Sequence, residues 1–131
     1  MSKRILRSLT VLVCLALAAA CKPTPTPPVA VQVTLTEMQL APSITSFKVG
    51  QPYAFTIVNN GTQVHELRIS PPMSAGISAM NDFAGVASVQ PGASTSFTYT
   101  FTQAYAVGGL EFACHLPGHY EGGMHTLITV Q

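Results

Sequence analysis

The sequence is short of charge, of tryptophan and of cysteine. Charged residues make up 8 % of the 131 residues, and tryptophan is absent. From residue 22 onward, three basic side chains stand against five acidic ones, which gives a net charge of −2. This balance excludes the strongly basic surface that a nucleic-acid-binding protein needs. So few charges also predict that any partner surface is apolar or weakly polar.

Long apolar runs are also missing. The longest begins at Leu9 and ends at Ala20, which is shorter than the roughly 20 residues of a membrane-spanning helix. Lys3, Arg4 and Arg7 precede it and three alanines end it, the pattern of an export signal. We therefore interpret residues 1–20 as a signal peptide and expect an exported protein in the periplasm or cell envelope.

Residues 21–30 combine a cysteine with a proline-rich stretch. Cys21 follows the small residues directly and resembles the lipidated cysteine of the bacterial lipobox, although Leu17 lies four residues before it where the usual aliphatic residue lies three before. The alternative is ordinary cleavage with Cys21 as a bystander. The following KPTPTPPVA cannot pair as a central strand and favours extended polyproline conformation, so we expect a tether. The lipid would be the only membrane attachment.

Residues 31–131 have the size of one domain, and their pattern predicts strands. Large apolar or aromatic residues recur at every second position over residues 31–36, 53–58 and 97–102, and turn signals separate the segments. Short strands punctuated in this way predict an all-β sandwich. Residues 73–85 break the alternation, so we expect a short helix or an irregular loop there.

A single thiol remains in this domain, because Cys14 and Cys21 precede it. Cys114 therefore has no partner for an internal disulfide, which leaves an intermolecular bridge, catalysis or metal binding. The stretch CHLPGHYEGGM favours metal, since four residues separate Cys114 from His119 and four more separate His119 from Met124.

The alternation also predicts where these side chains point. Cys114 shares its parity with the apolar Leu110 and Phe112, so its sulfur should face the core. His65 shares its parity with Leu67 and Ile69 on another strand. By the same reasoning Thr126, Ile128 and Val130 follow Met124 on its face of the last strand.

Two imidazoles, one thiolate and a more distant thioether form the ligand set of a blue copper centre. On His65, which follows the turn NNGTQ, and on the loop Cys114–His119–Met124, the domain resembles the cupredoxins, the family of plastocyanin, azurin, rusticyanin and the phytocyanins. The resemblance implies a Greek-key β-sandwich of about seven to eight strands. It also implies that these four residues bind one copper ion, cycling between Cu(I) and Cu(II).

In some features this sequence differs from particular members of the family. The ligand loop has the longer spacing of rusticyanin and the phytocyanins, and the phytocyanin disulfide is absent. Glu66 stands where family members often carry an asparagine that braces the ligand loop, so we expect its carboxylate to alter the charge around the metal. Phe112 should exclude water from the thiolate. His115 and His125, which alternate with ligands, should face outward as plain surface residues.

The resemblance implies outer-sphere electron transfer, with His119 nearest the surface as the electron port. We expect redox partner proteins to dock near His119 on a small apolar patch, and we expect a monomer without enzyme activity. The residues expected to form this patch are Leu116, Pro117 and Tyr120, with Pro71, Pro72, Met73 and Ile77 at its rim.

The same residues are also compatible with different roles. Cys114 could be an inert buried thiol, His65 a histidine satisfied by the backbone, and Met124 a core residue. The ligands could also serve copper handling, as a chaperone, buffer or resistance protein, although Met38, Met73, Met80 and Met124 are not clustered. A thiol enzyme or a Cys/His zinc enzyme is the third alternative.

Overall fold

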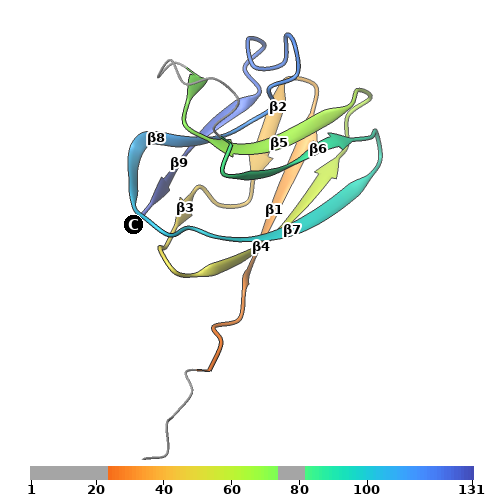
Figure 1. The fold of residues 1–131 in the computed structure, drawn as a ribbon. Coiled ribbons are helices and arrows are strands. Elements are labelled where there is room, and N and C mark those ends of the chain that lie inside the picture. Colours follow the sequence, from red (N-terminus) through yellow and green to blue (C-terminus); the bar gives the residue numbers. More distant parts are fainter. Residues whose placement is uncertain (1–23, 74–81) are drawn as a thin grey trace, which may run out of the picture.

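The computed structural model describes residues 24–73 and 82–131, which form a sandwich of two β-sheets (Figure 1). One sheet has four strands in the order β2-β1-β4-β7, and the other has five in the order β3-β9-β8-β5-β6. The strands of the first sheet are β1 (Val29–Thr36), β2 (Gln39–Pro42), β4 (Pro52–Asn59) and β7 (Ser94–Thr100). Those of the second are β3 (Ser46–Phe47), β5 (His65–Ser70), β6 (Ala84–Val89), β8 (Tyr105–Ala113) and β9 (His125–Val130).

The predicted all-β sandwich is confirmed, with nine strands in the described part of the chain instead of seven to eight. Two of the nine, β2 and β3, are only four and two residues long. Strands this short carry no measurable alternation, so no pattern in the sequence indicates them.

Alternating residues of facing strands fill the space between the sheets. Val31, Val33 and Leu35 of β1 are buried, and Phe55 and Ile57 of β4 join them through the parallel pairing of these two strands. Val29 already pairs with Tyr53, so β1 begins two residues before the domain start expected from the sequence. From the other sheet, Leu67, Ile69, Leu110, Phe112, Ile128 and Val130 complete the core.

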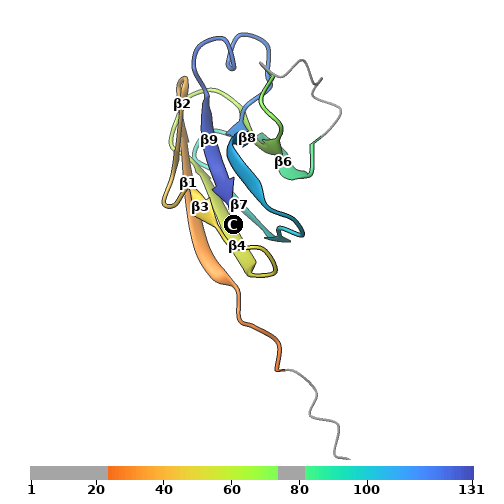
Figure 2. The same cartoon turned by 90° about the vertical axis from the view of Figure 1, so that its left-hand side faces the viewer.

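The loop between β8 and β9 lies at one end of the sandwich, and the N-terminal residues enter β1 at the opposite end (Figures 1 and 2). The turn between β1 and β2 lies at the loop's end too. Residues 24–28 are exposed and belong to no strand. Over the described ranges, the structure contains no helix with the length and apolarity needed to cross a bilayer.

Several expectations fall outside the described residues. The signal peptide at 1–20, the lipobox Cys21 and the rim residue Ile77 are among them. The segment expected to break the alternation, 73–85, is described only at its ends: Met73 is the last described residue before the gap, and Ala84 opens β6.

Candidate metal centre

The structure brings three of the four predicted ligands together in the interior. His65 opens β5, Cys114 follows the last residue of β8, and His119 lies in the loop that leads to β9. His65 Nδ1 lies 3.2 Å from His119 Nδ1, and Cys114 Sγ lies 3.4 Å from the same nitrogen. One ligand atom from each residue lies within 4.8 Å of the others, close enough for all three to contact one ion.

Backbone hydrogen bonds close the ligand loop on itself and place the backbone of Met124 beside those of Cys114 and His119. Cys114 N donates to the carbonyl of Met124, and Met124 N donates to that of His119, each at 3.0 Å. Gly118 and Gly123 have φ of +82° and +99°, values that glycine adopts without strain. Met124 is fully buried in the same apolar cluster as Cys114.

Burial controls the protonation of the candidate ligands. Burial raises the pKa of the Cys114 thiol, although backbone N–H groups of Leu116 and Glu66 oppose the rise by stabilising a thiolate. Burial also lowers the pKa of His65, with further lowering from His119, so its imidazole is held neutral. Neutral imidazole and a thiol with N–H groups facing its sulfur are the forms that a metal site needs.

Glu66 contacts the ligand loop through its side chain. Its Oε1 accepts a hydrogen bond of 2.9 Å from His115 N, the residue next to Cys114, and its Oε2 accepts one of 2.9 Å from Arg68 Nη2. Arg68 also lies 3.5 Å from Asp82. The carboxylate expected to alter the charge around the site is therefore paired with a guanidinium, and it braces the loop.

Of the two histidines that alternate with the ligands, His115 is not the plain surface residue that we expected. Its side chain is only 7 % exposed, and its Nδ1 lies 3.7 Å from Asp82 Oδ1. His125 is 39 % exposed and stacks on Tyr120 with ring centroids 4.4 Å apart. Tyr120 lies between these two histidines: its ring centroid is 5.9 Å from that of His115, and its hydroxyl donates to the buried carboxylate of Glu111.

Two residues around His65 are not among those singled out from the sequence. Asn59 is fully buried, and its Nδ2 donates 2.8 Å hydrogen bonds to the carbonyls of Gln63 and Val89. Its Oδ1 accepts from Gly61 N at 2.9 Å, so one side chain shapes the turn before His65. Glu37 reaches the same turn from the end of β1. The sequence does offer a sign of the role of Asn59: a polar amide stands where the alternation of β4 places a core-facing residue.

The donors fit copper. Two imidazole nitrogens and a sulfur converge in a buried space: Nδ1 of His65, Nδ1 of His119 and Sγ of Cys114. Imidazole suits both copper oxidation states, and soft thiolate and thioether ligands favour Cu(I). Residues His65, Cys114, His119 and Met124 are thus the candidates to hold the ion, and copper would supply one-electron redox chemistry there.

Solved structures of auracyanins and of an azurin resemble this fold along most of its length. Auracyanin from Roseiflexus castenholzii is 22 % identical over 82 % of this chain and 99 % of its own, with a TM-score of 0.60. Auracyanin A from Chloroflexus aurantiacus, a "blue" copper protein, is 18 % identical over 80 % and 100 %, with a TM-score of 0.63. An azurin from Methylomonas sp. strain J is 14 % identical over 79 % and 98 %, with a TM-score of 0.58.

Two curated proteins are similar in sequence, and both are named copper-resistant cuproprotein CopI. The one from Pseudomonas aeruginosa is 54 % identical over 43 residues, which span 33 % of this chain and 22 % of that protein. The one from Rubrivivax gelatinosus is 31 % identical over 103 residues, which span 72 % and 61 %. The chain thus spans less than two thirds of either relative. No protein-family model matches it.

These likenesses and the buried donor set support copper binding. The two-sheet β-sandwich agrees with the fold that the sequence resemblance implies. The chain has the cupredoxin fold.

Proposed function

We propose that the protein is a type 1 copper protein that carries single electrons between redox partners in the cell envelope. The observation that supports this most strongly is the buried convergence of two imidazoles and a thiolate, with Met124 buried beside them. A site built from both soft and borderline ligands serves Cu(I) and Cu(II) with the same residues. Little has to move when an electron arrives, so transfer is fast.

Electrons enter and leave at His119 in this proposal. It is 8 % exposed, whereas His65, Cys114 and Met124 have no exposed surface. Leu116 is partly buried and Pro117 is exposed next to it in the loop. A small apolar surface around one slightly exposed imidazole suits a brief encounter with a partner, because weak electron-transfer interfaces are small.

Copper handling is the second candidate, and the names of the two CopI relatives favour it. In that role the same residues would bind Cu(I) for storage or delivery, and the reduction potential would matter less than the affinity. Enzyme activity is not part of either proposal. The location in the envelope rests on the signal peptide and Cys21.

Spectroscopy of the copper-loaded domain separates the candidates. The electron-carrier proposal expects intense thiolate-to-copper absorption in the visible range, a type 1 electron paramagnetic resonance signal, and a reversible one-electron wave. A colourless protein that binds only Cu(I) would support handling and refute the carrier. Tight zinc binding with no redox wave would favour the enzyme alternative. Mass spectrometry of the full-length protein from membranes tests lipidation of Cys21.

A further inference from the structure

The turn between β1 and β2 places a carboxylate behind His65. Thr36 pairs with Gln39, so Glu37 and Met38 form the tip of this hairpin. Glu37 Oε1 lies 3.8 Å from His65 Nε2, the ring nitrogen on the other side from the candidate metal position. That nitrogen is buried and has no hydrogen bond within the described ranges, so the carboxylate is the charge that faces it.

The Glu37 carboxylate is fixed in this position. Its Oε1 accepts hydrogen bonds from Thr62 N at 2.5 Å, Gln63 N at 3.0 Å and Thr62 Oγ1 at 3.1 Å. These donors stabilise the charged form and lower its pKa to about 2. Gly61 permits the approach, because a Cβ there would lie 2.6 Å from Oε1. Glu37 therefore ties the hairpin to the segment that leads into His65.

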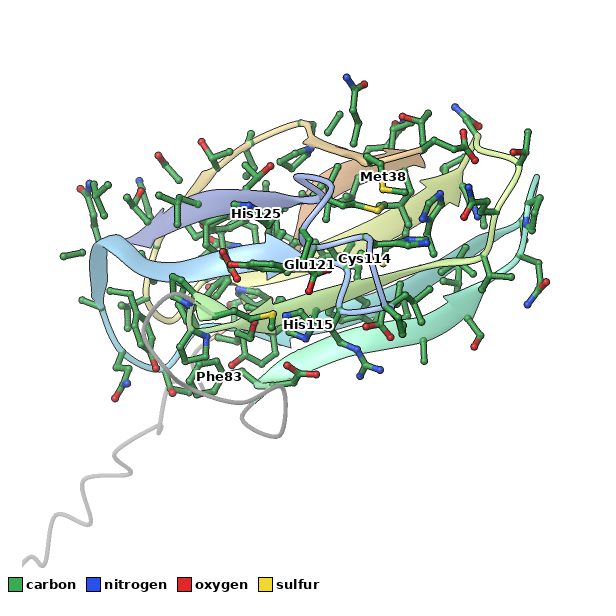
Figure 3. All side chains as sticks on the ribbon, turned by 90° about the horizontal axis from the view of Figure 1, so that it is seen from above. Met38, Phe83, Cys114, His115, Glu121 and His125 are labelled. Atoms are coloured by element: carbon green, nitrogen blue, oxygen red, sulfur yellow. The ribbon has the colours of Figure 1, made fainter. Side chains whose placement is uncertain are left out.

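Met38 holds the hairpin from the other side. It has a φ of 55°, a region that residues other than glycine rarely occupy. Its Sδ packs against Gly122 of the ligand loop so closely that a Cβ there would lie 2.7 Å away. Figure 3 looks onto this end of the sandwich and labels Met38, Cys114 and His115. A strained turn that contacts both ligand-bearing segments suggests a functional constraint.

We propose that Glu37 is a positioning residue for the metal centre: its charge keeps the proton of His65 on Nε2, directs the Nδ1 lone pair at the metal, and favours Cu(II) over Cu(I). This inference rests on the proposed function, because it concerns the same site. Metal-bound histidines commonly present their other nitrogen to a carboxylate, which fixes the tautomer and raises ligand basicity. A nearby negative charge also stabilises the more positive oxidation state.

The tautomer that Glu37 favours sets the donor and acceptor in the contact between the two rings. With its proton on Nε2, His65 can only accept at Nδ1, so His119 is the donor in their 3.2 Å contact. His65 then holds its lone pair toward the space shared with Cys114 before any metal arrives. Without the carboxylate, the proton could move to Nδ1 of His65 and occupy the position that the metal needs.

The Glu37→Gln variant tests the charge and preserves the turn, because its amide oxygen can still accept from Thr62 and Gln63. We expect Cu(II) affinity to fall about tenfold relative to Cu(I), which raises the reduction potential by about 59 mV for a one-electron couple. Glu121→Gln is the matched control: Glu121 is exposed, lies on the ligand loop (Figure 3), and loses the same charge. An equal shift in both variants would overturn the proposal, since any nearby charge would then suffice.

A second variant and a measurement without metal complete the test. Gly61→Ala keeps the charge but displaces Glu37 Oε1, so it should raise the potential in the same direction as Glu37→Gln. In the apoprotein, long-range ¹H–¹⁵N correlation should show His65 protonated on Nε2, and the Nδ1–H form should gain population in Glu37→Gln. An unchanged tautomer in that variant refutes the positioning role even if the centre proves not to carry electrons. A normal redox wave with no shift refutes the tuning role alone.

Discussion

Truncating Phe112 to alanine should separate the packing that supports the metal site from the site itself. Phe112 is fully buried between the sheets. Its ring meets those of Phe47 and Phe55 edge to face, with centroids 5.6 and 5.8 Å away. Phenylalanine-to-alanine changes in cores cost about 3–5 kcal/mol, and aromatic pairs of this geometry contribute about 0.5–1.5 kcal/mol within such values. We therefore expect a loss of about 4 kcal/mol in the free energy of unfolding.

Chemical denaturation of the apoprotein is the right assay, because bound copper would add its own binding energy to the folded state. Phe83→Ala is the matched control: Phe83 is 44 % exposed and touches Tyr105 at the surface. It should cost less than about 1 kcal/mol. A Phe112→Ala protein within about 1 kcal/mol of that control would refute the core assignment. If the truncated protein binds copper, water reaching Cys114 should alter the visible spectrum.

Three further changes probe the site. Cys114→Ser should abolish the visible absorption of the copper form while circular dichroism stays that of a β-sandwich; a coloured serine protein would contradict the ligand assignment. Leu116→Glu should slow electron exchange with a redox partner about tenfold and leave the copper spectrum unchanged, and an unaltered bimolecular rate would count against docking near His119. Asn59→Ala removes the donors to Gln63 and Val89 and should destabilise the apoprotein by about 2 kcal/mol, as measured by urea unfolding.

The long strands were predictable because each has one face on the core. Residues 31–36 and 53–58 lie in β1 and β4, and the larger apolar residues at every second position of each segment are buried. The parallel pairing of these two strands could not be predicted, since period two is the same in parallel and antiparallel sheets. The sequence of β6 shows why another strand was missed: it contains Gly85 and Ser88, both with positive φ, and pairs with β5 across a bulge.

The candidate ligands were predictable, but the parity of their positions is a weak guide. Along β5 and at the end of β8, residues of both parities are buried, including Glu66 and Glu111. The inward direction of Cys114 is therefore established by its contact with His119, not by burial alone. The spacing of Cys114, His119 and Met124 predicts the ligands better, because all three lie within one short segment of eleven residues. Glu37 is 28 residues from His65, so only the fold could bring them together.

Glu66 illustrates how a neighbour can offset part of the expected effect of a charged side chain. A carboxylate beside a thiolate should repel it and raise the pKa of the thiol, and this repulsion is present at Cys114. Arg68 lies on the same strand two residues later and binds Glu66 Oε2, which leaves Oε1 to hold His115 N. Arg68 also lowers the pKa of Cys114 through its own charge. A carboxylate can therefore brace this loop as an amide would, because a cation on the same face of β5 offsets its charge.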